Sequence, residues 1–237
     1  MLKLLKHELL SSYRPYLISL MVFIGVCLIL PQFSSWIGIY EGLFSVVFII
    51  STLVIFFTYL NIIYCFYKSM FTKVGYLTLT LPVNTRDVIF VKLLSALIWL
   101  AIASLAVKIG TKFLSDAMII TYFENSVDEL AGLPQITYTN YYYMFNSWIT
   151  LFFKTTSAIL SCYFVISFAH TNRIRKNRIA SAIGIYFIGL FVGAKFYDLL
   201  PQIITSWLWF SAVFEICLSV LFYCGTVYLI DHKLEME

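Results

Sequence analysis

The sequence predicts an all-α, polytopic membrane protein with six transmembrane helices, and two observations carry this prediction. The chain of 237 residues is 61% hydrophobic and only 12% charged, whereas soluble domains carry about 25% charged residues. It also contains six long apolar stretches, and about 20 apolar helical residues cross the hydrocarbon core of a bilayer. Because these stretches are continuous, helices are favoured over the alternating strands of a barrel. We expect residues 1–237 to form a single transmembrane domain.

The positions of the spans follow from the distribution of charge. No charged residue lies between Arg14 and Glu41 or in the range 42–67, and these gaps hold the first two spans. Lys92 lies near enough to the start of the third span to snorkel toward water. We expect the six spans at about residues 16–32, 42–64, 88–107, 148–170, 179–197 and 206–230.

The lysines and arginines predict that both termini are cytoplasmic, because these residues are enriched in cytoplasmic connections. One side of the membrane receives only Lys108, Lys112 and Lys195. The other side receives Lys3, Lys6, Arg14, Lys68, Lys73, Arg86, Lys92, Arg173, Arg175, Lys176, Arg178 and Lys233. The connections at 68–87 and 171–178 are therefore also expected in the cytoplasm.

Residues 2–14 predict a short helix that lies along the membrane surface. Its apolar face consists of Leu2, Leu5, Leu9 and Tyr13, and basic residues occur around the rest. A basic amphipathic helix of this kind binds at the boundary between lipid and water. The alternative is a cytoplasmic extension of the first span.

The connection at 68–87 is more apolar than a solvated loop. Exposed apolar residues framed by charges mark protein-binding surfaces, so this segment is a candidate docking surface. The residues expected to be exposed are Met70, Phe71, Val74, Tyr76 and Leu77. The alternative is a loop that packs against its own helical bundle.

The connection from about Gly110 to Asn146 is expected on the outer side and is too long for a simple turn. It ends in aromatic residues that suit the interfacial belt of membrane proteins. These residues are Tyr138, Tyr141, Tyr142, Tyr143 and Trp148. The alternative is a role in stacking against a ligand.

Two charged residues, Lys154 and Glu215, are expected inside the membrane, in the fourth and the sixth span. At about 1.5 Å per residue they lie at similar depths. A lone charge at such a depth costs upwards of about 2.5 kcal/mol. We therefore predict an ion pair between Lys154 and Glu215, which either serves the structure or lines a substrate path.

Gly189 and Gly193 lie four residues apart in the fifth span. Small residues at this spacing let a second helix approach closely. The helix that packs there belongs either to the same chain or to a second copy.

No motif for catalysis, nucleotide binding or metal binding occurs in the sequence. A Walker motif is absent, and the three histidines are too far apart to predict a metal site. The five cysteines lie in or beside apolar runs, as small buried hydrophobes do. No basic cluster with interleaved aromatic residues indicates nucleic acid. We expect neither an enzyme nor a metal or cofactor in this chain.

The stretch from the second span into the third, FYKSMFTKVGYLTLTLPVNTRDVIFVKLLSALIW, resembles permease subunits of ABC-2-type ABC exporters. It is similar above all to small permeases of Gram-positive bacteria, including phenol-soluble-modulin exporters. The matching residues are Gly75, Tyr76, Leu77, Thr80, Leu81, Pro82, Lys92, Leu93, Leu94, Ala96, Leu97 and Trp99. The segment LLKHEL at 4–9 resembles the elbow helix of that family. Val74 departs from the pattern, because related sequences often carry an acid there.

The resemblance implies a permease in the bacterial cell membrane that dimerises with a second copy or a similar permease. A separate cytoplasmic ABC ATPase would bind ATP and Mg. The resemblance also implies a coupling helix between the second and third spans that docks this ATPase. The residues expected to make this contact are Met70, Phe71, Val74, Gly75, Tyr76 and Leu77.

The apolar, aromatic spans favour an amphipathic or lipophilic cargo. The resemblance implies export of antimicrobial or cytolytic peptides, which is common among the permeases that this chain resembles. One alternative is an exporter of a lipophilic drug or an ion. Another is a membrane sensor or scaffold that transports nothing. An ion-coupled carrier is disfavoured, because Glu215 is the only acidic residue in the spans and carriers place several ionisable residues there.

Overall fold

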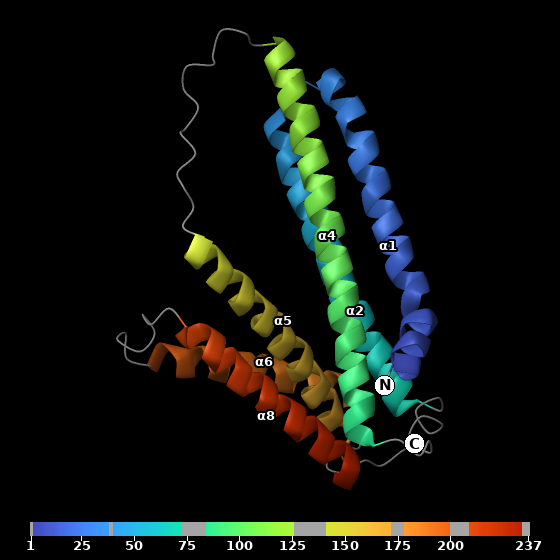
Figure 1. Cartoon of the computed structure of the whole chain (residues 1–237), viewed down its shortest axis with the longest axis vertical. Coiled ribbons are helices and arrows are strands. Elements are labelled where there is room, and N and C mark those ends of the chain that lie inside the picture. The colour runs from blue at the N-terminus through green and yellow to red at the C-terminus, as the bar shows by residue number, and fades with distance from the viewer. Residues whose placement is uncertain are drawn as a thin grey trace. The chain divides into compact units, whose positions relative to one another are not determined.

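The computed structural model describes residues 2–37, 40–72, 84–125, 141–171, 178–199 and 209–233. They form six α-helices, which Figure 1 labels along the chain. These are α1 (Leu2–Ile37), α2 (Tyr40–Phe71), α4 (Thr85–Asn125), α5 (Tyr141–Ala169), α6 (Arg178–Leu199) and α8 (Phe210–Lys233). The described ranges contain no β-strand. The prediction of an all-α protein is therefore confirmed, and each predicted span falls largely within one helix.

Five of these helices are long and apolar enough to cross a membrane. Their spanning parts are Lys3–Ile29, Phe48–Phe71, Thr85–Phe113, Ser147–Ala169 and Phe210–Asp231. In α6 the apolar stretch among the described residues is shorter and covers Ala180–Gly193. The chain is thus a multi-pass membrane protein.

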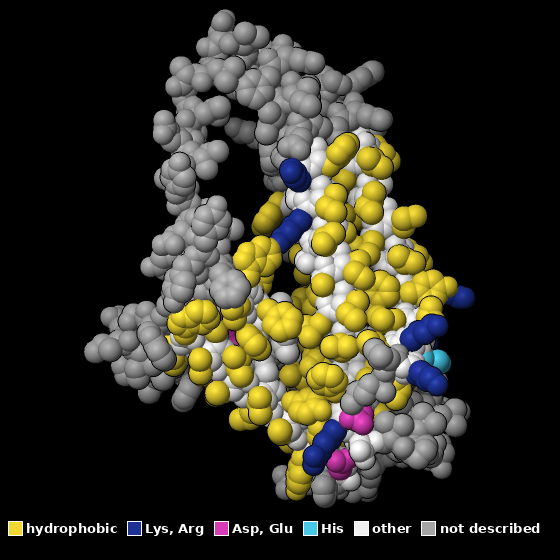
Figure 2. Space-filling model, in the orientation of Figure 1, with side chains coloured by type: hydrophobic (Ala, Val, Ile, Leu, Met, Phe, Trp, Pro, Cys, Tyr) yellow, Lys and Arg dark blue, Asp and Glu magenta, His cyan; other side chains and the backbone are white. Residues whose placement is uncertain are grey.

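The outward faces of the helices are apolar, as a lipid environment requires. Large side chains such as Met21 on α1, Phe48 on α2 and Phe191 on α6 are more than half exposed. Figure 2 shows hydrophobic side chains over the described helices, with basic side chains gathered near the N-terminal end of α1. In water such extensive apolar surface would be unusual.

α4 has 41 residues, which corresponds to a length of about 60 Å at 1.5 Å per residue. The hydrocarbon core is only about 30 Å thick, so α4 either extends beyond the core or tilts within it. The spanning part of α4 ends at Phe113, close to the predicted start of the outer connection at about Gly110. α4 itself continues without a break from Gly110 to Asn125, so the first part of that connection is helical, and its location on the outer side stays a prediction. No proline occurs between these residues to end the helix.

Contacts along the chain define two compact units, and α2, α4 and the first residues of α1 are divided between them. One unit contains residues 1–4, 63–94 and 138–237, and the other contains residues 5–62 and 95–137. Because α2 and α4 run through both units, the expected single domain stays a prediction.

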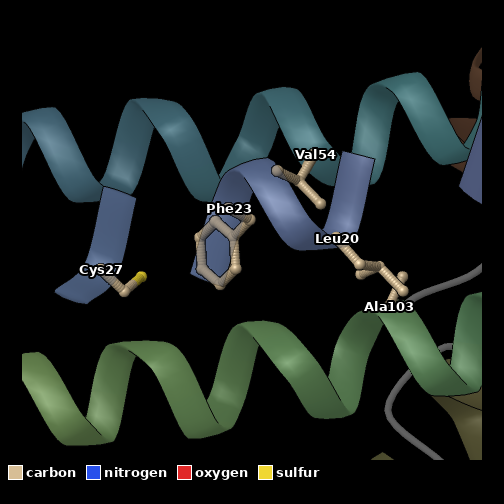
Figure 3. Close-up of a cluster of buried hydrophobic side chains, with 5 residues drawn as sticks. All are labelled: Leu20, Phe23, Cys27, Val54 and Ala103. Carbon is tan, nitrogen blue, oxygen red and sulfur yellow. The ribbon is translucent and has the colours of Figure 1, made fainter. Parts of the chain in front are cut away.

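The core of the second unit lies where α1, α2 and α4 run side by side (Figure 3). It consists of Leu20, Phe23, Cys27, Val54 and Ala103. Beyond this core, the rings of Tyr16 and Trp99 stack with their centroids 4.6 Å apart. Such aromatic contacts add about 0.5–1.5 kcal/mol beyond area burial. The helices of this unit are thus joined by side chains from three segments of the chain.

Gly110 permits the close approach of α4 to α1 in the same unit. A Cβ atom at this position would lie 2.6 Å from the Phe23 ring and 3.0 Å from Cys27 Sγ. Only a residue without a side chain fits at this point, which explains a glycine inside a helix that it would otherwise weaken.

In the first unit, α5 packs against both α6 and α8, and Figure 1 shows these three helices together. The rings of Phe164 on α5 and Phe222 on α8 are 5.7 Å apart. Gly225 accommodates the Phe164 ring, which would lie 2.8 Å from an added Cβ atom. α5 is thus the central helix among these three.

The predicted surface helix at 2–14 is part of α1, which is continuous from Leu2 to Ile37. Pro15 lies inside it, and transmembrane helices tolerate proline where nearby groups satisfy the freed carbonyl. Whether residues 2–14 lie along a membrane surface stays a prediction.

Candidate functional site

The candidate site is the end of α2, where the predicted docking segment begins. Met70 and Phe71 form the last turn of this helix. The other predicted coupling residues, Val74, Gly75, Tyr76 and Leu77, lie outside the described residues. The coupling helix itself therefore stays a prediction, whereas the helix ends on either side of it are described.

Met70 is completely buried, with 0% of its surface exposed. The expectation that it is exposed is wrong, because α2 continues to Phe71 and directs Met70 into the helical bundle. Phe71 is half-buried. For these two residues, the structure supports the alternative that the segment packs on its own bundle.

An aromatic cluster joins the end of α2 to α5. The Phe66 ring stacks on the Tyr163 ring with centroids 3.8 Å apart and planes 9° apart. One to two turns later, Phe71 lies 4.3 Å from the His170 ring, and Tyr67 lies 5.5 Å from it. We call Phe66, Tyr67, Phe71, Tyr163 and His170 the aromatic clamp.

His170 follows the last residue of α5 and is 8% exposed. Its Nδ1 atom lies 2.9 Å from the carbonyl oxygen of Ile166. Because a carbonyl only accepts hydrogen bonds, Nδ1 carries a proton and donates it. The same carbonyl also accepts the backbone N–H of His170 at 3.2 Å, so the side-chain bond is a second one, and it restrains rotation of the ring. From the sequence, His170 is only one of three histidines that are too far apart to predict a metal site.

Lys92 ties α4 to α2 beside the clamp. It is 4% exposed, and its ammonium donates a hydrogen bond of 2.7 Å to Ser69 Oγ. Ser69 in turn donates to the Phe66 carbonyl. The expectation that Lys92 snorkels toward water is wrong, because its ammonium turns inward to Ser69. The partner lies 23 positions away, and the sequence gives no signal for this contact.

The start of α4 is fixed at the other end of the docking segment. The Asn84 carbonyl accepts hydrogen bonds from the backbone N–H groups of Asp87 and Val88. Asp87 lies in the first turn, where a negative charge favours the helix dipole. Tyr223 on α8 donates a 2.9 Å hydrogen bond to the Arg86 carbonyl. The segment at 73–83 therefore connects two anchored helix ends.

The predicted intramembrane charges lie on α5 and α8. Ser157, one helical turn after Lys154, donates a hydrogen bond to the Glu215 carboxylate. Among the described side chains no ion pair joins Lys154 to Glu215, and Lys154 is exposed. The ion pair therefore stays a prediction, and sequence reasoning missed Ser157 as a partner.

Gly189 and Gly193 have no atom within 4 Å of an added Cβ. No described helix of this chain packs against them. The sequence leaves open whether the partner helix belongs to the same chain or to a second copy. Among the described residues, no helix of the same chain fills this role.

None of the five cysteines, all of which lie in the described helices, forms a disulfide. All five are free, and only Cys27 is buried, while Cys217 and Cys224 are exposed on α8. The expectation of small buried hydrophobes is confirmed for Cys27 alone. Within the described residues, no group of three or more histidine, cysteine or acidic residues is placed to hold a metal ion.

Comparisons with protein-family models, with curated proteins and with solved structures gave no match.

Proposed function

We propose that this chain is the transmembrane subunit of an ATP-driven exporter that works with a separate cytoplasmic ABC ATPase. The observation that carries the proposal is the segment at 73–83, whose Gly75-Tyr76-Leu77 sequence resembles a coupling helix. Its support from the structure is mechanical. The segment begins after the aromatic clamp and ends at the hydrogen-bonded start of α4. A force on this segment would act on two helix ends that are held by these contacts.

The proposed topology has six spans, with α6 as the fifth and both termini in the cytoplasm of a bacterial cell. α6 has 22 residues, and about 20 suffice for a span. Residues 2–14 act as the elbow helix. Reporter fusions at each terminus and at positions 126–140 test this topology. Signals from the same side at all three positions would contradict it.

The proposed cargo is an amphipathic peptide of the antimicrobial or cytolytic class. The apolar and aromatic composition of the spans supports this choice over a sugar or a metal ion. A lipophilic drug or an ion is the alternative cargo.

A second candidate function is a membrane sensor or scaffold without transport. The observation that favours it is the same docking segment, since a different cytoplasmic protein could bind there. The two functions differ in one property, the binding of an ATPase.

The experiment is a pull-down of the detergent-solubilised chain with the candidate ATPase, comparing wild type with Tyr76→Asp/Leu77→Asp. Phe71 is unsuitable for this test, because its substitution would disturb the contact with His170. We expect the ATPase to bind wild type and to be lost from the double variant. Tyr13→Asp is the matched control, since Tyr13 is an exposed tyrosine outside the docking segment.

If no ATPase binds wild type, the sensor or scaffold function replaces the exporter. If the ATPase binds the double variant as well as wild type, the ATPase docks elsewhere and the coupling helix is misassigned. Thermal unfolding of each variant ensures that lost binding does not reflect a lost fold.

A further inference from the structure

We propose that His170 is the positioning residue through which movement of the docking segment reaches α5. The inference rests on the proposed function, since it assigns a path for the force that the ATPase would exert. It concerns a residue outside the docking segment.

First, the contact between Phe71 and His170 joins the ends of two helices. Phe71 is the last residue of α2 and lies within the docking segment at 68–87, and His170 is the first residue after α5. Their ring centroids are 4.3 Å apart. A displacement of the docking segment would therefore be passed to the end of α5 through the contact between the Phe71 and His170 rings.

Second, α2 and α5 are in contact at two separate points near their ends. Phe66 stacks on Tyr163 at about 7 Å before Phe71 along α2, at 1.5 Å per residue. On α5, the corresponding spacing from Tyr163 to His170 is about 10 Å. Two helices that touch at one point pivot about it, whereas two separated contacts prevent the pivot. Met70, with no exposed surface, lies between these contacts on α2. The end of α2 and the end of α5 are thus joined at two separated points.

The third step is the rigidity of the histidine ring itself. The hydrogen bond from Nδ1 to the Ile166 carbonyl holds the ring in one orientation. A side chain held in this way transmits displacement with little loss to rotation about χ2. Neither phenylalanine nor asparagine reproduces both properties, since the first lacks the donor and the second lacks the ring.

The fourth step leads from α5 to α8. Phe164 contacts Phe222, and Ser157 donates a hydrogen bond to Glu215. These contacts lie on the same helix as Tyr163, so α8 follows α5. Movement at the docking segment would reach two spans of the first unit in this order.

The test uses the full chain reconstituted with its ATPase and a fluorophore on Leu151→Cys, in a background without the native cysteines. Leu151 lies on α5 and is 54% exposed, so a dye is accommodated. The readout is the emission shift of the dye when ATP and vanadate trap the closed ATPase. It requires no knowledge of the cargo.

We expect the emission shift in wild type and a large part of it in His170→Phe, which keeps a ring against Phe71. We expect its loss in His170→Asn, which keeps a donor for the Ile166 carbonyl but has no ring. ATPase binding should be equal in all three proteins, because His170 lies outside the docking segment. A role in folding alone would lower ATPase binding and thermal stability together with the emission shift.

An emission shift in His170→Asn equal to that of wild type overturns the inference. If His170→Asn fails to fold, Phe71→Leu removes the same ring contact from the other side and should also lose the shift. Absence of ATPase binding to wild type would overturn the proposed function and this inference together. An ATPase that binds wild type without any effect of the His170 substitutions on the shift overturns the inference alone.

Discussion

The hydroxyl of Ser157 on α5 lies between the backbone carbonyl of Lys154 and the carboxylate of Glu215 on α8. It is 3.0 Å from the carbonyl oxygen and donates a hydrogen bond to the carboxylate. A carboxylate in a span needs a partner, because the bilayer core offers no water to solvate it. Ser157 supplies one hydrogen-bond donor to this carboxylate. Ser157 itself lies one helical turn after Lys154, the basic residue on α5.

Replacement of Ser157 by alanine should therefore destabilise the protein. We expect a loss of about 1 kcal/mol, since hydrogen bonds between transmembrane helices average somewhat below this value and charged acceptors raise it. Unfolding of purified protein in mixed micelles measures the change. The matched control is Ser104→Ala, because Ser104 bonds only to a carbonyl of its own helix and its loss should have a smaller effect. Equal effects of the two substitutions would show that the bond to Glu215 contributes nothing.

The predicted ion pair of Lys154 and Glu215 is tested by exchanging the charges. Because Glu215 contacts α5 one turn from Lys154, a flexible lysine stem has the reach to meet it. Lys154→Glu and Glu215→Lys should each lower the yield of folded protein, and the double exchange should recover part of it. If the double variant is as poorly folded as the worse single variant, the two residues do not pair.

Gly110 should not accept even one methyl group. In Gly110→Ala the new Cβ would lie 2.6 Å from Phe23, and overpacking of this kind costs about 1–3 kcal/mol. Adding Phe23→Leu, which removes the ring, should recover part of the lost stability. Gly184→Ala is the control, because nothing lies within 4 Å of its added Cβ. Thermal unfolding in detergent compares the variants, and an unaffected Gly110→Ala would mean that α1 and α4 are farther apart.

The spans could be predicted from the sequence because charge is excluded from long segments, and that signal is local. The contacts at the candidate site could not be predicted in this way. Lys92 contacts Ser69 only through tertiary packing. Met70 is buried because α2 continues to Phe71, beyond the predicted end of the second span at residue 64. His170 gives no signal in the sequence, since its role arises only from the approach of Phe71.

Gly110 shows the same difference. The sequence places it at the start of the outer connection, whereas in the structure it lies inside α4 and its missing side chain admits the Phe23 ring. A single sequence does not distinguish a glycine that ends a helix from one that admits a neighbouring ring. The structure distinguishes them by what lies next to the missing side chain.

If a second copy of the chain packs against α6, the paired substitution Gly189→Leu/Gly193→Leu should weaken the dimer without affecting the fold of one chain. The space beside both glycines is open in the single chain, so leucine meets no described atom there. Cross-linking in micelles, followed by sizing, measures the dimer. The control is Gly25→Leu on α1, which also has open space. An unchanged dimer, or none in wild type, would exclude α6 as the interface.

The buried contact between Lys92 and Ser69 predicts that substitutions at these two residues have non-additive effects on stability. An ammonium that is 4% exposed depends on its acceptors, so Ser69→Ala should cost about 1–3 kcal/mol in wild type. In the background of Lys92→Met the ammonium is absent, and the same substitution should cost much less. The two effects are therefore not additive, as expected for residues in contact.

Thermal unfolding of Ser69→Ala, Lys92→Met and the double variant completes this cycle. Ser19→Ala serves as the control, because Ser19 bonds only within α1 and its effect should be the same with and without Lys92. Additive effects of Ser69→Ala and Lys92→Met would mean that the ammonium does not depend on Ser69. The hydrogen bond between Lys92 and Ser69 would then contribute little to holding α4 against the end of α2.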